Sequence, residues 1–229
     1  MWTGQMSRRD EARRQIEARV YRDAVGEPPD PKWKSLLALV TEQGFAARIV
    51  RKRLHLPTPL NTTDRMVLEH QIFPVYRSDP AIRSVLFVGC GAYTAHYQGE
   101  FFPDVRFATI EPDPELSQYG ASRHVVAPLE ELANHFPAAS FDLIICNGVF
   151  GWGLDRMEQC DAAFGQCHSC LTENGHFLLG WDDVPRRTPI ALANVPSLAR
   201  FRKYAFPAFG SWRYLTDTPF RHTYDFYQK

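Results

Sequence analysis

The segment SVLFVGCGAYTAHYQGEFFPDVRFATIE, residues 84–111, contains the pattern that decides the fold. Its opening apolar letters, VLFV, have the length and composition of a buried parallel strand rather than of a helix. The run ends in Gly89-Cys90-Gly91, where the glycines let the backbone turn sharply and approach a ligand closely. A second apolar run ends at Glu111, whose carboxylate is placed to accept hydrogen bonds from both hydroxyls of a ribose. The segment therefore predicts a nucleoside-binding site.

Three kinds of nucleoside site share parts of this pattern. A dinucleotide site has a third glycine at the start of the following helix, where this chain has Thr94. A phosphate-binding P-loop ends in Gly-Lys-Ser or Gly-Lys-Thr, which the segment lacks. S-adenosylmethionine (SAM) carries no phosphate, so its site needs the turn and the carboxylate but no phosphate-binding helix end. SAM is therefore the favoured ligand, with a nicotinamide or flavin site and a chance pair of glycines as the alternatives.

Beyond the glycine turn, short apolar runs alternate with helical patterns. This alternation predicts an α/β fold with a doubly wound, mostly parallel, seven-stranded Rossmann-like sheet. The tail, residues 212–227, alternates aromatic and polar side chains around Pro219 and predicts an antiparallel pair that closes the sheet. The expected parallel strands span 84–88, 106–110, 124–127, 141–146 and 176–181, and the expected helices span 128–136, 156–171 and 190–204.

Three helices are expected before the first strand. Two of them span 7–25 and 32–56, and the third starts at Thr63 and stops at Pro74. Because they precede the nucleoside strand, we expect them to form a helical lid over the carboxyl edge of the sheet. The expected division of the chain is a lid, residues 1–80, and a SAM-binding Rossmann-like domain, residues 81–229.

The amino-acid composition limits the kinds of partner that are expected for the protein. Lys and Arg together number 26, as do Asp and Glu, so no net charge indicates nucleic acid or an anionic membrane. The basic cluster at 51–55 is interpreted as complementing a helix C-terminus rather than contacting RNA. The N-terminus has no signal-peptide core and no run reaches transmembrane length, which predicts a cytoplasmic protein. The expected partner is a small molecule, or SAM alone, and no expectation follows for the oligomeric state.

The cysteines predict reduced thiols rather than a metal site. Their number, five, is odd. Cys167 and Cys170 have a CxxC spacing, but together with Cys160 they fall on one face of the predicted helix, where cysteine acts as a small apolar residue. No second ligand pair lies at a suitable spacing, so no metal is expected.

Over residues 80–229 the chain resembles the class I SAM-dependent methyltransferases. The motifs that carry the resemblance are VLFVGCGAY, IEPD after the second run, FDLIICN at 141–147 and the turn in LTENGHFLLGW. The resemblance implies that Gly89 and Gly91 pass beneath the methionyl and ribose parts of SAM and that Glu111 holds the ribose. The other cofactor-binding residues that it implies are Cys90, Tyr93, Pro112, Asn147 and Gly148, with Pro128 and Leu129 beside the adenine.

The chain also departs from the family pattern. Phe87 stands where the family often has an acid, and Tyr93 stands where it usually has a small residue. An acid that commonly contacts the adenine amine is absent around 127–128, and Asn147 is not followed by the Pro-Pro-aromatic sequence of nucleobase amino methyltransferases. SAM binding is compatible with these changes, whereas the acceptor stays open; Tyr93 is expected to narrow the space where an acceptor would enter.

The reacting centre is expected at the end of the fourth strand, where residues 147–155 combine three glycines with two large aromatic residues. Phe150 or Trp152 would place a ring face against the sulfonium, or would pack beneath the lid. The candidate catalytic residues are Asn147, Trp152, Trp181 and, from the aromatic tail, Ser211. The candidates for a base are Tyr76, His96, Tyr97, Asp182 and His222.

Three functions are consistent with these residues. The first is methyl transfer from SAM to a small molecule by in-line displacement at the sulfonium. In the second, SAM is the only substrate and closes to azetidine-2-carboxylate with release of methylthioadenosine, as in SAM cyclases that look broadly similar to this chain. The third is a non-catalytic SAM-binding module.

Overall fold

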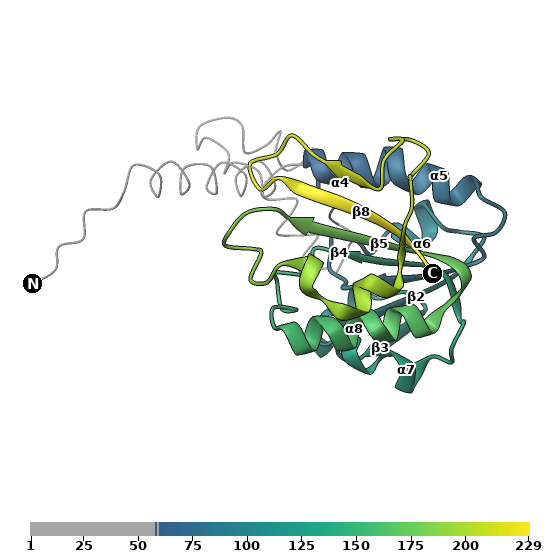
Figure 1. Cartoon of the computed structure of the whole chain (residues 1–229). Helices are drawn as coiled ribbons and strands as arrows, with labels where there is room; N and C mark the ends of the chain where they lie inside the picture. The colour runs from purple at the N-terminus through teal and green to yellow at the C-terminus, as the bar shows by residue number, and fades with distance from the viewer. Residues whose placement is uncertain (1–57, 59) are drawn as a thin grey trace, which may run out of the picture.

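The computed structural model describes residue 58 and residues 60–229 of the chain (Figure 1). In this part, eight strands form one sheet in the order β3-β2-β1-β4-β5-β8-β6, and β7 pairs with β8. Strands β1 to β5 pair in parallel, whereas β8 is antiparallel to β5, β6 and β7. The mostly parallel Rossmann-like sheet is thus confirmed. The strands are β1 Ser84–Val88, β2 Arg106–Glu111, β3 Arg123–Val126, β4 Phe141–Asn147, β5 Leu171–Asp182, β6 Arg202–Lys203, β7 Arg213–Leu215 and β8 His222–Gln228.

The predicted strand count is wrong by one for the described part of the chain, because β6 was not predicted. Its two residues are both exposed and show no apolar alternation. The helix predicted over 190–204 is also wrong: this segment contains two short 3₁₀ turns before β6, η4 Leu192–Asn194 and η5 Pro196–Arg200. Pro196 explains the difference, because proline has no N–H to extend a helix and favours an extended residue before it; Val195 has ψ 111°.

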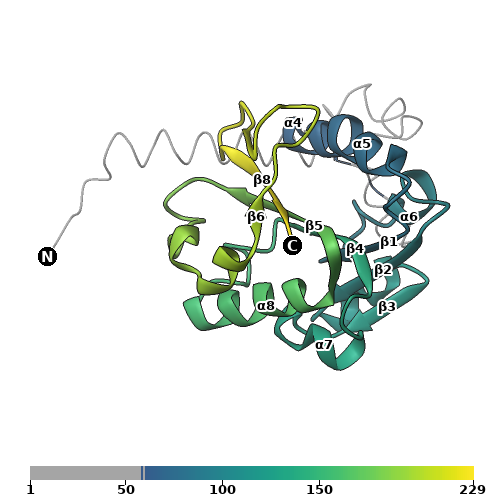
Figure 2. The ribbon, with the colours of Figure 1, turned by 45° about the vertical axis from the view of Figure 1, so that its right-hand side comes forward.

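The central strands β1 and β4 are apolar except at Ser84, Asp142 and Asn147 near their ends, because both faces of the sheet are covered. Leu86 and Ile144 point to one buried cluster, beneath helix α8, and Val85 and Leu143 point to the other, beneath the first described helix. Alternating side chains of the same strands therefore supply both cores, which fixes the strands in the middle of a three-layer structure (Figure 2).

Helix α8, Met157–Cys170, covers one face of the sheet together with η3 Leu129–Glu131 and α7 Leu132–His135. Cys160, Cys167 and Cys170 are fully buried in α8, as predicted for apolar packing. Burial raises the pKa of the Cys160 thiol to about 12, so this side chain stays protonated. The residues that the structure describes contain no group of side chains arranged to hold a metal ion.

The other face is covered by a helix that runs from residue 63 to residue 78 as α4 Thr63–Val67, the π-helical segment η1 Leu68–Ile72 and α5 Phe73–Ser78, and by the short α6 Tyr97–Glu100. The predicted stop at Pro74 is wrong. The π-helical segment changes the hydrogen-bond pattern just before Pro74, so that the proline lies in the first turn of α5, where its missing N–H is tolerated.

This helix packs on the face of the sheet: Leu68, Ile72 and Phe73 are buried in the same cluster as Phe87. Only its first turn approaches the carboxyl edge, where the lid was predicted. The helices predicted at 7–25 and 32–56 and the basic cluster at 51–55 lie outside the described residues, so the lid and the division at residue 80 stay predictions.

Candidate active site

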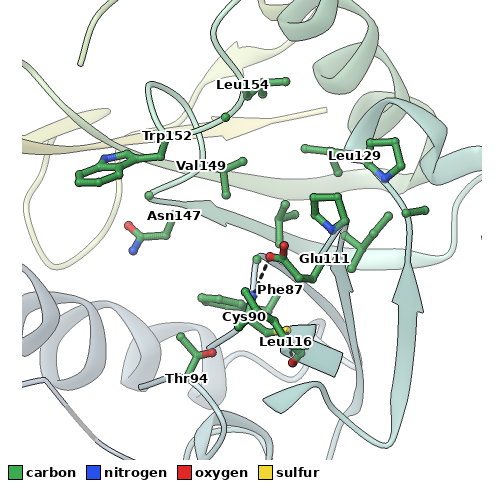
Figure 3. Close-up of a pocket in the computed structure, with 18 of the residues that line it drawn as sticks. Phe87, Cys90, Thr94, Glu111, Leu116, Leu129, Asn147, Val149, Trp152 and Leu154 are labelled. Atoms are coloured by element: carbon green, nitrogen blue, oxygen red, sulfur yellow. Dashed lines mark hydrogen bonds between the residues drawn. The ribbon is translucent and has the colours of Figure 1, made fainter. Parts of the chain in front are cut away.

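A cavity of about 520 Å³, the first cavity, opens at the carboxyl ends of β1, β2 and β4 (Figure 3). All the predicted cofactor-binding residues except Gly91 line it: Gly89, Cys90, Tyr93, Glu111, Pro112, Pro128, Leu129, Asn147 and Gly148. Figure 3 shows Glu111 in the middle of the cavity, Leu129 on one side, and Asn147 and Trp152 on the opposite side. These residues come from four separate segments, which the parallel sheet brings to one edge.

The turn after β1 is held by hydrogen bonds that its backbone N–H groups donate to β2 and to a side chain. Gly89 has φ 80°, a conformation that side-chain-bearing residues rarely adopt, and its N–H donates to the Ile110 carbonyl at 2.8 Å. The Gly91 N–H donates to Thr94 Oγ1 at 3.0 Å. Thr94, which occupies the position of the third dinucleotide glycine, therefore caps the turn instead of leaving room for a pyrophosphate.

Glu111 is oriented across this turn. Its Oε2 accepts a hydrogen bond from the Cys90 N–H at 3.3 Å, and its Oε1 accepts one from the Asp113 N–H at 3.0 Å. A carboxylate has about four acceptor positions, so two remain for a vicinal diol. The residues present thus fit the ribose of a nucleoside.

The apolar wall of the first cavity is broader than predicted. Leu116, Ala127, Val149 and Leu154 line it together with Leu129 and provide surfaces for a flat purine ring. Glu130 also lines the cavity. The sequence shows no acid at 127–128 to contact the adenine amine. Glu130, three residues beyond Ala127, is a candidate for that contact.

Cys90 does not provide a nucleophile. Its Sγ donates to the Leu116 carbonyl at 3.4 Å, and burial, together with Glu111 and Asp113, raises the pKa of its thiol to about 12. A thiol with this pKa stays protonated at neutral pH, so Cys90 contributes shape rather than chemistry to the wall.

A second cavity of about 720 Å³ adjoins the first. Both cavities are lined by five residues, which we call the junction: Arg65, Tyr93, Asn147, Gly148 and Trp152. The remaining wall comes from residues 60–64, 186–187 and 218–220, together with Asp182 and His222. A ligand in the first cavity and a molecule in the second would therefore meet at the junction.

Tyr93 lies in the junction, where it was predicted to limit access. Its ring is 37% exposed, and the Arg65 guanidinium lies 4.8 Å from the ring centroid. The ring also packs against Gly91, where an added Cβ would come within 3.0 Å of Tyr93 Cε1. Gly91 thus leaves room for the large Tyr93 side chain. This side chain forms part of the wall between the two cavities.

Asp182, His222 and Asn147 form a hydrogen-bonded chain that ends at the junction. His222 Nδ1 is 2.7 Å from Asp182 Oδ1, and His222 Nε2 is 3.0 Å from Asn147 Oδ1. The sheet register explains the contact, because Asp182 lies opposite His222 across β5 and β8 and Asn147 lies opposite Gly180 across β4 and β5. An added Cβ at Gly180 would overlap Asn147 Oδ1, so only glycine leaves room for this chain.

Trp152 is tied to the same chain. Its Nε1 donates to Asp182 Oδ2 at 3.1 Å, and the Arg187 guanidinium lies 3.2 Å from its ring centroid. One face of the ring is thus covered by a cation of the protein. The other ring considered for the sulfonium, Phe150, is fully buried against Trp181 and lines neither cavity, which contradicts a role in ligand contact.

Two predicted catalytic residues lie outside both cavities. Trp181 is buried, and its Nε1 donates to Asp225 Oδ2 at 3.1 Å. Because side chains alternate along a strand, Trp181 and Asp182 point to opposite faces of β5, and only Asp182 reaches the site. Ser211 precedes β7, and its Oγ accepts from the Arg213 N–H at 3.3 Å; it too lines neither cavity.

The structure also separates the candidates for a base. Tyr76 of α5 and Tyr97 of α6 are buried in the core between these helices and the sheet, and His96 packs against Tyr97. These three residues line neither cavity, whereas Asp182 and His222 both line the second. The sequence therefore had both residues of this second-cavity pair among its candidates but gave no indication that the two are hydrogen-bonded partners.

Arg65 was not predicted and is the main addition to the site. It is 7% exposed, and its Nη1 donates to the Tyr97 hydroxyl at 3.0 Å; that hydroxyl in turn donates to Glu69 Oε1 at 2.6 Å. Burial raises the pKa of Glu69. Among the described residues no carboxylate lies within ion-pair distance of Arg65, so a buried guanidinium faces the junction without a direct counter-charge.

Comparison with known proteins agrees with this geometry. Residues 86–179 match the family model described as a methyltransferase domain. This match covers 94 of the 229 residues and assigns a methyltransferase domain to the segment, with S-adenosylmethionine as the cofactor of such a domain. None of the curated proteins compared with the sequence matches it.

Solved structures share the fold at low sequence identity. The N-methyltransferase NodS from Bradyrhizobium japonicum is 16% identical with a TM-score of 0.57, covering 74% of this chain and 98% of its own. Its complex with S-adenosylhomocysteine (SAH) gives a TM-score of 0.52 at 16% identity, with 74% and 93% of the two chains covered. A TehB-like SAM-dependent methyltransferase from Corynebacterium glutamicum is 16% identical with a TM-score of 0.51, covering 80% and 97%. At these identities the likeness concerns the fold.

In the described part of the chain, none of the helices is long and apolar enough to cross a membrane.

Proposed function

We propose that the protein transfers the methyl group of SAM to a small molecule bound in the second cavity. The observation that carries this proposal is the junction: two cavities, one with residues that fit a nucleoside and one lined by both polar and apolar groups, share a wall at Asn147, Tyr93 and Trp152. Bound SAM supplies an activated methyl group on a sulfonium. What remains for the protein is to bind, to align and to exclude water.

Each part of the first cavity has a task in this proposal. Glu111 binds the ribose hydroxyls, and Leu116 and Leu129 bracket the adenine. Arg65 binds the carboxylate of the methionyl part, which supplies a counter-charge that no described residue gives its buried guanidinium at ion-pair distance. This arrangement directs the reacting end of the ligand toward the junction.

The junction residues align the acceptor. Asn147 gives a polar contact at the end of β4, and Tyr93 and Trp152 line both cavities. In the proposed arrangement these side chains limit the directions from which the acceptor can approach, and displacement at a methyl group requires approach in line with the bond that breaks. Trp181 and Ser211 have no part in this scheme.

Product analysis tests the proposal. The purified protein is incubated with SAM alone and with SAM plus pools of small amines and alcohols, and the products are measured by mass spectrometry. We expect SAH only in the presence of a suitable pool. Release of methylthioadenosine and azetidine-2-carboxylate from SAM alone would instead establish the cyclisation that the sequence also allows, and would contradict methyl transfer.

The second cavity favours methyl transfer over that cyclisation. A cyclase needs space for one folded SAM molecule, whereas this chain has a further cavity of about 720 Å³ beside the nucleoside site. That volume lies in the range typical of small-molecule sites. A non-catalytic module would have no need of the separate acceptor cavity.

Arg65 allows a test of how the ligand lies. Arg65→Met is expected to weaken SAH binding by roughly ten- to a hundredfold, because a charge-assisted contact is lost, and to leave methylthioadenosine unaffected, because this nucleoside has no carboxylate. Calorimetry with both ligands measures the difference. Arg65→Lys keeps the positive charge and should lose less affinity for SAH than Arg65→Met does.

Arg123→Met is the matched control, since Arg123 also lies over an aromatic ring, that of Phe136, but lines neither cavity. It should bind both ligands as the wild type does. Equal weakening of SAH and methylthioadenosine by Arg65→Met would contradict the carboxylate contact and would indicate a general disturbance of the site.

A further inference from the structure

We propose that Asp182 and His222 are a positioning pair that holds the Asn147 amide with one end free at the junction, where it hydrogen-bonds the nucleophilic group of the methyl acceptor. The acceptor is then a molecule whose nucleophilic atom carries an N–H or O–H, an amine or a hydroxyl compound. This inference rests on the proposed function of the two cavities.

The first observation is an incomplete hydrogen-bond set at Asn147. The residue is 5% exposed, and one end of its amide contacts His222 Nε2. Its Nδ2 is buried and has no hydrogen-bond partner in the described part of the chain. An unpaired buried amide costs about 1–3 kcal/mol, so a ligand group at the junction would gain from pairing with it.

The second observation is the order of the chain. Asp182 Oδ1 lies 2.7 Å from His222 Nδ1 and favours a proton on this nitrogen. In the tautomer with its proton on Nδ1, the imidazole has a lone pair at Nε2, which accepts a hydrogen bond from Asn147 Nδ2 after a half-turn of the amide. Asn147 Oδ1 is thereby turned to the free position, where it accepts a hydrogen bond from an amine or a hydroxyl group.

The third observation is that the chain has little freedom. The second oxygen of Asp182 accepts from Trp152 Nε1, so the carboxylate is held at both ends. His222 is buried at 5% exposure, with its ring edge-on to Tyr224. On the side of β5 the amide lies close against Gly180, where an added Cβ would overlap Asn147 Oδ1. The pair therefore fixes the position of Asn147 without touching the cofactor cavity, which His222 and Asp182 do not line.

Sinefungin is a suitable probe, because this SAM analogue carries an amine at the place of the methyl group. In the proposed arrangement its amine donates to Asn147 Oδ1, an interaction that SAH cannot make. We expect the wild type to bind sinefungin more tightly than SAH, as measured by calorimetry. His222→Phe should lower this preference about tenfold, since an amide that is no longer held loses a charge-assisted contact, while SAH binds as before.

The variants separate positioning from a structural role. His222→Gln offers an amide oxygen that can still accept from Asn147 and should retain part of the preference for sinefungin. His176→Phe is the control: His176 is another buried histidine of the sheet, on β5, and it lines neither cavity, so its loss should leave the preference unchanged. Should His222→Phe not fold, Asn147→Leu, which removes both amide atoms at similar volume, carries the test.

Two negative results have different meanings. If wild-type protein binds SAH but Asn147→Leu or a folded His222→Phe keeps the full preference for sinefungin, the positioning pair is overturned. If the wild type binds neither SAH nor sinefungin, the proposed function itself fails.

Discussion

Replacing Glu111 by alanine is expected to abolish most SAM and SAH binding. The carboxylate is held over the glycine turn by the Cys90 and Asp113 N–H groups, and it has two acceptor positions left for the ribose hydroxyls. Loss of two charge-assisted hydrogen bonds is worth about 2–4 kcal/mol, which corresponds to a roughly 30- to 700-fold increase in the dissociation constant. Calorimetry with SAH measures it directly.

Two further variants sharpen this measurement. Glu111→Gln keeps one acceptor oxygen and should lose less affinity than Glu111→Ala. Glu115→Ala removes a carboxylate that lies nearby along the chain but is exposed and lines neither cavity, so it should bind SAH normally. Unchanged binding by Glu111→Ala would remove the basis for any SAM-dependent activity at this site, whether transfer or cyclisation.

Gly180→Ala is expected to lower the stability of the protein. The new Cβ would overlap Asn147 Oδ1 and come within 3.1 Å of His222 Nε2, in the middle of a buried strand. Overpacking of this kind costs about 1–3 kcal/mol, because backbone or side chains must move. Denaturant unfolding of the two proteins gives the difference in free energy of unfolding.

The control for this variant is Gly99→Ala. Gly99 lies exposed in α6, and an added Cβ there meets no atom within 4 Å, so the substitution should be neutral or stabilise by up to about 1 kcal/mol. Combining Gly180→Ala with Asn147→Ala removes the overlapping amide and should recover part of the lost stability. If Gly180→Ala is as stable as the wild type and the double variant gains nothing, the close approach of Asn147 and Gly180 is refuted.

Much of the cofactor site could be predicted from short segments of sequence. The apolar runs of β1 and β4 identify buried parallel strands by themselves, because continuous apolar sequence is what a sheet covered on both faces requires. The glycine turn and Glu111 follow directly at the ends of two neighbouring strands. Since parallel strands end at one edge, their proximity follows from the order of the chain alone.

The helices show where such local reasoning fails. Residues 190–204 have the composition of a helix, but Pro196 interrupts it. At Pro74 the result is the opposite: the helix continues past the proline, because the π-helical segment before it changes the hydrogen-bond pattern. In both cases a proline decides the result through its exact place in the hydrogen-bond pattern.

The sequence by itself determined the α/β sheet, the nucleoside turn, Glu111 and the buried cysteines of α8, because each depends on residues that are close in sequence or on one period of side chains. Only the tertiary structure decided the second cavity, the place of Arg65 in the junction and the Asp182–His222–Asn147 chain. Alternation along β5 shows that Trp181 and Asp182 face opposite ways, but not which of them faces the site. That choice depends on the register between β5 and β8, which is set by packing of the whole sheet.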